Sequence, residues 1–417
     1  LRHFIIKPGV AIYGGFAGTE TAVEERDWNI NQTVLSGDIL NNDVWDDIEN
    51  KWTSREDNIF NLFVVQNDSN IENAVLDGLI LTAGHAVNTS HPAAEMGGAI
   101  MLGNYNKISI LNCTFFGNHG RWGGAIDAGD GCNVDIKNSV FHVNTVEKSF
   151  NGGAIRALNS VLTIDGSEFM ENYADSGSAV QSQMGQVVIT NSEILYNYGV
   201  TSGALAIAEG SEFQIDNCWF EGNSVYNPEN ENWSSGGALN ISTISGSIRN
   251  SFFIGNSAGR GAAISGWSSD HNTILIEKCV FEDNIGIEAG AAVFSFFNVE
   301  VVTSEFVNNT VTGSDGGGGG AISLQSGDLR VVESEFIGNS SAARGLAIAA
   351  SDENYEYTVH IEQSLFDGNF STSSEDSGTV NIHAFEGMEV QESIFSNNVG
   401  GGLTVSKTDG MTFQTDF

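Results

Sequence analysis

Residues 123–144 read GGAIDAGDGCNVDIKNSVFHVN, and this stretch contains the two short patterns that decide the fold. The first is the step Gly-Gly-Ala-Ile at residues 123–126. The second is Phe141 followed three residues later by Asn144. Internal repeats are sought before any other signal, because a missed repeat misassigns the whole fold. Both patterns recur along most of the chain.

The Phe-x-x-Asn pattern occurs eleven times, with Ile replacing Phe in one copy. It runs from Asn118 to Asn398, which gives a mean period of about 28 residues, within the range of solenoid repeats. The Gly-Gly-Ala column, with its variants, runs from Ala99 to Thr379 and has the same mean period. Two independent markers with one period indicate a repeat architecture. The eleven copies are Phe115/Asn118, Phe141/Asn144, Phe169/Asn172, Ile194/Asn197, Phe220/Asn223, Phe253/Asn256, Phe281/Asn284, Phe306/Asn309, Phe336/Asn339, Phe366/Asn369 and Phe395/Asn398.

The spacing within each repeat is typical of short strands. An aliphatic residue lies five positions before each Phe and a small residue two positions before it, as in Ile136, Ser139 and Phe141. A spacing of two places side chains on one face of a strand, and the step of three predicts a bend. One such unit cannot bury its apolar face alone, whereas stacked units can. The sequence therefore predicts an all-β, right-handed parallel β-helix of about a dozen rungs.

The repeated columns are interpreted as structural. We expect Phe, Ile and Ser or Cys to fill the interior, and Gly-Gly-Ala to form a tight bend that faces the core. We expect the Asn column at a corner, because Asn tolerates left-handed backbone and its amides can form a hydrogen-bonded ladder.

Residues 1–96 are less regular but rich in predicted strands. We expect them to form N-terminal rungs with inserted loops, and residues 97–417 to form the regular repeats of one continuous solenoid. Leu81 falls in the Phe column. The predicted strands are Phe4–Ile6, Val10–Tyr13, Thr33–Leu35, Phe63–Gln66 and Val75–Thr82, and the predicted insertions are Asn41–Asp57, Tyr226–Trp233 and Gly313–Gly320.

The charge balance excludes some classes of partner. Of 417 residues, 16 are Lys or Arg and 53 are Asp or Glu, which gives a formal charge of −37. Nucleic-acid binding needs clustered basic residues, so we expect no nucleic-acid partner. Docking to an anionic membrane surface is disfavoured for the same reason. The chain begins and stops within the pattern, so we expect flanking domains of a longer protein.

The paired patterns over residues 97–402 resemble the repeats of the chlamydial polymorphic outer-membrane proteins, and more widely those of bacterial surface and secreted parallel β-helix proteins. Lys7–Glu20, Asp27-Trp28 and Leu35–Ile39 look like the first rungs of large secreted bacterial β-helix proteins, which often carry a C-terminal sorting or anchoring domain. The resemblance implies surface display and adhesion, an extracellular or outer-membrane-associated location, and contact with export or anchoring machinery. It carries over no catalytic residue, because the shared motifs are scaffold.

One cluster has the composition of an enzyme site. The residue after each Gly-Gly-Ala-Ile step is expected to point outward, which makes Asp127 and Arg156 neighbours on successive rungs, with Asp130 and Lys148 close in sequence. β-Helices also host polysaccharide lyases and hydrolases, whose chemistry uses carboxylates or a basic residue. The alternative is an ion pair between rungs, of small energetic value.

Metal sites are weakly indicated. His85 and His119 occupy one column on consecutive rungs, with His91 nearby, and histidines can bind Zn²⁺ or Ni²⁺. The column continues as Thr145, Tyr173 and Tyr198, which favours a mixed surface ladder. The acidic loop Asn41–Asp57 could hold Ca²⁺ loosely, or simply solvate the surface, since no twelve-residue Ca²⁺-binding loop of the helix–loop–helix type is present.

Three further features have structural and functional interpretations. Trp219, Phe252 and Val280 form a candidate apolar stripe, the kind of surface that marks partners, unless the loop Tyr226–Trp233 covers it. Gly316–Gly320 lacks the Lys-Ser/Thr of a phosphate-binding loop. The cysteines are expected to be inert: Cys113, Cys218 and Cys279 in the Ser column, and Cys132 out of phase and without an evident partner.

The sequence assigns no catalytic, cofactor-binding or metal residue. The predicted function is a non-catalytic, extracellular adhesin or stalk segment that binds glycans or cell surfaces. The alternatives are a carbohydrate-active enzyme on the same scaffold and a purely structural spacer.

Overall fold

The computed structural model describes residues 3–46, 51–65, 73–87, 95–227, 234–242, 245–267, 272–314, 317–351, 357–372, 378–383, 387–406 and 412–416. The chain divides into two compact units, Leu1–Tyr198 and Gly199–Phe417. Each unit is described by itself.

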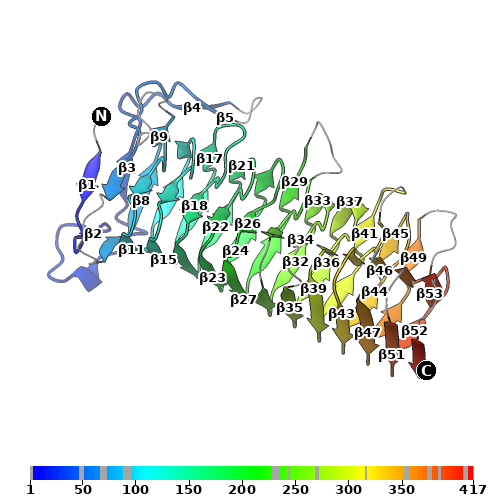
Figure 1. Ribbon diagram of the computed structural model, residues 1–417. Helices are drawn as coiled ribbons and strands as arrows, with labels where there is room; N and C mark the ends of the chain where they lie inside the picture. Colours follow the sequence, from blue (N-terminus) through cyan, green and yellow to red (C-terminus); the bar gives the residue numbers. More distant parts are fainter. Residues whose placement is uncertain are drawn as a thin grey trace. The chain divides into compact units, whose positions relative to one another are not determined.

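The first unit winds through four parallel sheets, named A to D, and each turn of the chain after the first adds one strand to each sheet (Figure 1). Sheet A contains β1 (Phe4–Ile6), β6 (Phe63–Val65), β10 (Ile100–Leu102), β14 (Ile126–Ala128), β18 (Ile155–Leu158) and β22 (Val180–Gln183). Sheet B contains β2 (Ala11–Tyr13), β7 (Ala74–Asp77), β11 (Lys107–Leu111), β15 (Asn133–Lys137), β19 (Val161–Asp165) and β23 (Gln186–Thr190). Sheet C contains β3 (Thr33–Ser36), β8 (Leu79–Thr82), β12 (Thr114–Phe116), β16 (Val140–His142), β20 (Glu168–Met170) and β24 (Glu193–Leu195). Sheet D contains β9 (His85–Ala86), β13 (His119–Gly120), β17 (Thr145–Val146), β21 (Tyr173–Ala174) and β25 (Tyr198–Gly199).

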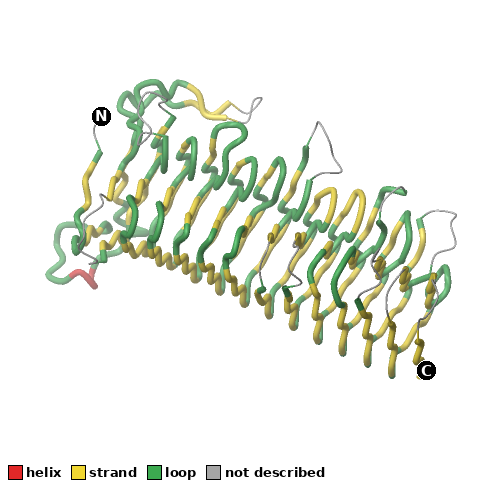
Figure 2. Tube along the Cα trace, viewed as in Figure 1, coloured by secondary structure: helices red, strands yellow, loops and turns green. Residues whose placement is uncertain are grey.

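Two elements of the first unit lie outside these sheets. β4 (Val44–Asp46) and β5 (Lys51–Thr53) pair antiparallel as a hairpin. The single turn η1 (Val23–Glu25) is the only helix among the described residues, as Figure 2 shows in red. The described residues contain no helix with the length and hydropathy needed to cross a membrane.

The second unit has the same four-sheet plan. Sheet A contains β26 (Leu205–Ala208), β30 (Leu239–Ser242), β34 (Ile264–Trp267), β38 (Val293–Ser295), β42 (Ile322–Leu324), β46 (Ile348–Ser351), β50 (Val380–His383) and β53 (Leu403–Ser406). Sheet B contains β27 (Glu212–Asp216), β31 (Gly246–Arg249), β35 (Thr273–Glu277), β39 (Asn298–Val302), β43 (Leu329–Val332), β47 (Thr358–Glu362), β51 (Gly387–Gln391) and β54 (Thr412–Asp416). Sheet C contains β28 (Trp219–Glu221), β32 (Phe252–Ile254), β36 (Val280–Glu282), β40 (Glu305–Val307), β44 (Glu335–Ile337), β48 (Leu365–Asp367) and β52 (Ile394–Ser396). Sheet D contains β29 (Ser224–Val225), β33 (Ser257–Arg260), β37 (Ile285–Ala289), β41 (Thr310–Val311), β45 (Ser340–Ser341) and β49 (Phe370–Ser371).

The predicted parallel β-helix is therefore confirmed, and its columns are in register. Phe115 pairs with Phe141 across β12 and β16, and their ring centroids lie 4.5 Å apart with the planes at 1°. In the second unit, the Phe253 ring lies 4.6 Å from that of Phe220 and 4.9 Å from that of Phe281. These rings are buried, so a column of stacked phenylalanines forms the core under sheet C.

The Asn column forms the predicted ladder. The Nδ2 of Asn118 donates to Oδ1 of Asn144 at 3.0 Å, and Asn144 donates to Asn172 at the same distance. The expected left-handed backbone, however, was assigned to the wrong residue. The residue before each ladder Asn adopts it, as at Gly117 and Val143, whose φ angles are 61° and 54°. The chain turns at that position, which lets the following Asn side chain point into the core.

The Gly-Gly-Ala step is a tight bend facing the core, as expected. Gly123 has φ of 58°, and a Cβ there would lie 2.2 Å from the carbonyl oxygen of Ile126. Ala125 is fully buried. A side chain at Gly123 would therefore push the bend away from the start of the strand that follows it, β14.

The N-terminal strands join the same sheets. β1 pairs with β6, β2 with β7, and β3 with β8. Leu81 pairs with Phe115, which confirms its place in the Phe column. The insertion 41–57 contains the β4–β5 hairpin, whereas the sequence predicted only a loop there.

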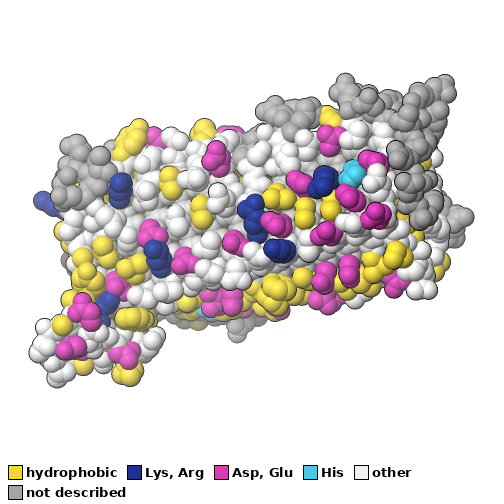
Figure 3. All heavy atoms as spheres, turned by 90° about the horizontal axis from the view of Figure 1, so that it is seen from below, with side chains coloured by type: hydrophobic (Ala, Val, Ile, Leu, Met, Phe, Trp, Pro, Cys, Tyr) yellow, Lys and Arg dark blue, Asp and Glu magenta, His cyan; other side chains and the backbone are white. Residues whose placement is uncertain are grey.

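The outer faces of the sheets are mixed in character. Figure 3 shows Lys and Arg side chains beside Asp and Glu side chains on the face in view, among apolar ones. In the second unit, Arg249 pairs with Glu277 at 2.9 Å and Arg330 with Glu300 at 2.8 Å, each pair joining neighbouring rungs of sheet B. Such exposed pairs contribute little to stability.

Candidate functional site

The first unit contains a groove of about 840 Å³, formed where the β4–β5 hairpin and the residues after it lie beside sheet D. One wall comes from residues 52–56 and the floor from sheet D, with further lining from the ends of sheet C strands. The lining residues are Trp52, Thr53, Ser54, Arg55, Glu56, His85, His119, Val143, Thr145, Val146, Glu171, Asn172, Tyr173, Tyr196 and Tyr198.

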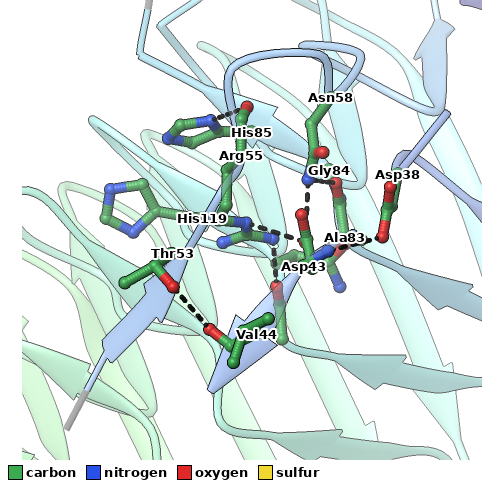
Figure 4. A network of polar contacts seen from close by, with 12 residues as sticks. Asp38, Asp43, Val44, Thr53, Arg55, Asn58, Ala83, Gly84, His85 and His119 are labelled. Carbon is green, nitrogen blue, oxygen red and sulfur yellow. Dashed lines mark hydrogen bonds and ion pairs between the residues drawn. The ribbon is translucent and has the colours of Figure 1, made fainter. Parts of the chain in front are cut away.

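A polar network holds the wall against the solenoid (Figure 4). The Nε of Arg55 donates to Asp43 at 3.2 Å, and Nδ2 of Asn58 donates to the same carboxylate at 2.9 Å. Arg55 also donates to the carbonyl of Gly117 at 2.6 Å, and Asn58 to that of Ala83 at 2.9 Å. Both side chains thus bind backbone carbonyls of the rungs, and the wall has a fixed position.

An aromatic contact completes the docking of the wall. The indole of Trp52 lies edge to face against Phe116, with ring centroids 5.9 Å apart. A Cβ on Gly117 would lie 3.1 Å from the indole nitrogen, so the absence of a side chain there lets the indole approach the rung. Such an edge-to-face pair contributes about 0.5–1.5 kcal/mol beyond its buried area.

The floor of the groove is formed by the residues that directly follow the ladder asparagines in the sequence. His85 pairs with His119, His119 with Thr145, and Thr145 with Tyr173. The His85 and His119 rings lie 5.3 Å apart, and the Tyr173 and Tyr198 rings stack at 5.6 Å and 10°. The predicted mixed ladder is confirmed, and it lies at the base of the groove.

The two histidines are held in their neutral form. Burial, the neighbouring His85 and the charge of Arg55 together lower the pKa of His119 to about 3. Burial also lowers the pKa of His85, although its Nδ1 lies 2.9 Å from the carbonyl oxygen of Arg55. Nδ1 of His119 lies 2.7 Å from Oγ1 of Thr145. Near pH 7 the floor is therefore uncharged at both rings.

The depressed pKa of His119 predicts a loss of stability in acid. The unfolded chain binds the proton with a pKa near 6.5, whereas the folded chain does not until about pH 3, so stability falls as the pH drops below 6.5. Relative to His119→Gln, the native chain should lose about 2 kcal/mol between about pH 7.5 and about pH 5. Urea unfolding at both pH values measures this difference. Parallel pH profiles of the two proteins would contradict the assignment.

The cluster at Asp127 is an ion pair, but it is buried. Asp127 and Arg156 are in register across β14 and β18, and Nε of Arg156 donates to Oδ1 of Asp127 at 2.6 Å. The column was predicted to point outward, but an outward position does not expose this pair, because the side chains of Asp127 and Arg156 are 2% and 9% exposed. The guanidinium lies 4.5 Å from the Trp122 ring centroid, and Trp122 packs edge to face on Phe150.

The groups around this pair do not assemble an acid–base site. Burial raises the pKa of Asp127 to about 6 despite the opposing charge of Arg156. Asp130 instead accepts a hydrogen bond from Nδ2 of Asn159 at 2.8 Å, and its backbone N–H donates to Oδ1 of Asn104 at 3.1 Å. No contact joins Lys148 to Asp127 or Arg156 in the described structure.

Two described carboxylates at or next to the ends of the acidic 41–57 loop, Asp38 and Asp57, already have hydrogen-bond donors. Asp38 accepts from the backbone N–H groups of Asn42 and Asp43 at 3.1 and 3.0 Å, and Asp57 accepts from Leu40 at 2.8 Å. Among the described residues, no group of three or more His, Cys, Asp or Glu side chains could hold a metal ion. His91, and residues 47–50 of the loop, lie outside the described residues.

The apolar stripe lies in the second unit, where the sequence predicted it. Trp219 pairs with Phe252 and Phe252 with Val280 along sheet C. The Trp219 and Phe252 rings stack at 4.9 Å, and Phe252 is 37% exposed. The loop predicted to cover the stripe lies, for residues 228–233, outside the described residues.

The four cysteines are buried and unbonded to one another. Cys113, Cys218 and Cys279 occupy the Ser column, as predicted; the backbone N–H of Cys113, for example, donates to Oγ of Ser139. Cys132 does have a partner that the sequence did not reveal, since its N–H donates to Oγ of Ser160 at 2.9 Å.

The groove itself was not predicted, although both of its parts were noticed. The insertion 41–57 and the column from His85 to Tyr198 are separate features of the sequence. What joins them is the contact of Arg55 with Gly117, whose residues lie 62 positions apart. No local pattern indicates that contact.

Comparisons with known proteins support a parallel β-helix family. Residues 97–275 match the family model described as "Right handed beta helix region". The chain is 27% identical over 187 residues to the Metabotropic glutamate receptor-like protein R of Dictyostelium discoideum, a match that covers 45% of this chain and 10% of that protein. The chain thus spans a small fraction of that relative's length. No solved structure matches this chain. This all-β chain is a right-handed parallel β-helix.

Proposed function

We propose that this chain is the ligand-binding segment of a cell-surface or secreted protein, and that it binds a glycan or a cell-surface ligand without catalysis. The groove of the first unit carries the proposal. It combines a floor of histidine, threonine and tyrosine side chains with a wall that includes the Trp52 indole, and its volume is in the range of small-molecule sites. Aromatic side chains with polar atoms at their edges suit the amphipathic faces of sugar rings.

One comparison and one sequence resemblance support the proposal. The matching relative is described as a receptor-like protein, which is in line with a surface location. The repeats resemble those of bacterial surface proteins, and the family match includes the groove residues from His119 to Tyr198. An adhesin role, export and anchoring are parts of the proposal.

One experiment measures both the binding and the cleavage of polysaccharides. The purified chain is incubated with insoluble neutral and acidic polysaccharides, with and without Ca²⁺, and sedimented protein and new chain ends are measured in the same tube. We expect retention without new chain ends and without a Ca²⁺ requirement. The double variant Tyr173→Ala/Tyr198→Ala should be retained at least about tenfold more weakly, a difference of about 1.4 kcal/mol.

The control is Tyr105→Ala, which removes a 64% exposed tyrosine that does not line the groove. Its retention should equal that of the native chain. Failure of every polysaccharide to retain the protein would overturn the glycan proposal. New chain ends would favour the carbohydrate-active enzyme instead.

A further inference from the structure

The floor of the groove offers a row of polar edges at a regular spacing. Parallel strands lie about 4.8 Å apart, so the side chains at His85, His119, Thr145 and Tyr173 repeat at roughly that interval along sheet D. In the described structure, the His119 ring has one hydrogen-bond partner, Oγ1 of Thr145, and none is present for the Tyr173 hydroxyl. A ligand that lies along this row meets one polar group at each rung.

The described lining residues of the groove present no available positive charge. Arg55 is the one cation among the lining residues, its side chain is 6% exposed, and its donors are directed to Asp43 and Gly117. His85 and His119 are neutral at pH 7, as shown above. A carboxylate or sulfate on the ligand would therefore find no counter-ion.

The exposed charge at the groove is negative. Glu56 and Glu171 both line it, and the Glu171 side chain is 56% exposed, with its carboxylate 3.1 Å from Nε2 of His142. The whole chain carries a formal charge of −37. The local and the overall fields both repel an anionic ligand.

The geometry disfavours an extended peptide as the ligand. Peptides that add to a sheet need an unpaired strand edge, whereas β13, β17 and β21 are each paired on the floor of the groove. The floor offers hydroxyl and imidazole groups together with aromatic edges. These groups match a ligand that is rich in hydroxyls and has no charge.

We propose that the groove selects an uncharged, extended polysaccharide that lies along the His85–Tyr198 column, and rejects its carboxylated counterpart. This proposal rests on the proposed function and deepens it by naming the class of glycan. Tyr173, Tyr198 and His119 provide the contacts, and Glu56 and Glu171 provide the discrimination.

The test compares oligosaccharides of equal length that differ only at C6. β-1,4-Linked mannan and glucan oligosaccharides are paired with the corresponding mannuronate and oxidised glucan oligosaccharides, and calorimetry measures each Kd at low salt. We expect at least one neutral member to bind about tenfold or more tightly than its acidic partner. Added salt should narrow the difference, because screening weakens the repulsion.

Two variants separate the roles of the residues. The double variant Glu56→Gln/Glu171→Gln should reduce the ratio between the acidic and neutral Kd values severalfold, while the Kd of the neutral ligand changes little. The double variant Tyr173→Ala/Tyr198→Ala should bind the neutral ligand more weakly. Glu305→Gln serves as the control, since it removes an exposed carboxylate of the second unit that does not line the groove.

Each outcome has a separate meaning. Tighter binding of an acidic member, or binding that the tyrosine variant leaves unchanged, would overturn this inference while leaving a glycan-binding role intact. If no member of either set binds, and the polysaccharide sedimentation is also negative, the proposed function itself fails.

Discussion

Replacing Phe253 with alanine is expected to lower the free energy of unfolding by about 4 kcal/mol. The ring is fully buried and stacked between Phe220 and Phe281, at 4.6 and 4.9 Å. Truncation removes the buried ring and leaves a cavity that the rungs above and below cannot close, because each is fixed by its own ladder. Chemical denaturation of the two proteins measures the difference.

The adjacent residue provides the control. Phe252 precedes Phe253 in β32, points to the opposite face and is 37% exposed. Phe252→Ala should cost about 1 kcal/mol or less, most of it from the lost contact with the Trp219 ring. Equal losses in the two variants would mean that inward and outward positions have been assigned wrongly.

Replacing Asn256 with alanine should cost a similar amount, about 3–5 kcal/mol, for a different reason. Its Oδ1 accepts from both the backbone N–H and the Nδ2 of Asn223, each at 3.0 Å. Its Nδ2 donates to the carbonyl of Phe220 at 3.1 Å and to Oδ1 of Asn284 at 3.0 Å. The substitution therefore leaves several buried polar groups without partners, and each contributes part of the loss.

An exposed amide provides the control for Asn256→Ala. Gln214 lies in β27 and is exposed, so Gln214→Ala should change the stability by less than about 0.5 kcal/mol. Asn256→Asp is a useful second variant, because it keeps the shape but replaces the donor with a charged acceptor facing Oδ1 of Asn284. A full recovery of stability in that variant would contradict the ladder assignment.

The scaffold was predictable from particular residues. The distance of three from Phe141 to Asn144, and the recurrence of that pair at a nearly constant period along the chain, required that like residues stack. Even the irregular N-terminal region followed this rule, since Leu81 pairs with Phe115 as its phase predicted. The residue with left-handed backbone at the corner could not be predicted from the sequence. That position is occupied by residues as different as Gly117 and Val143, so it has no common side chain to identify it.

The exposure of Asp127 could not be predicted either. Alternation along β14 correctly placed it on the opposite face from Ile126. The alternation of side chains along a strand predicts which side of the sheet a residue occupies, but it does not predict whether another segment covers that side. Trp122, from a segment before a sheet A strand, lies over Arg156 and packs edge to face on Phe150, which covers that part of the surface.

The sequence by itself thus determined the repeat, the parallel sheets and the residues of each column, because a period of stacked units is a local and redundant signal. The tertiary structure alone decided the groove and the buried ion pair. Both depend on contacts that the repeat does not contain, such as Arg55 with the carbonyl of Gly117 and Trp122 with Arg156. A contact made once leaves no period in the sequence, and only the packing of the folded chain reveals it.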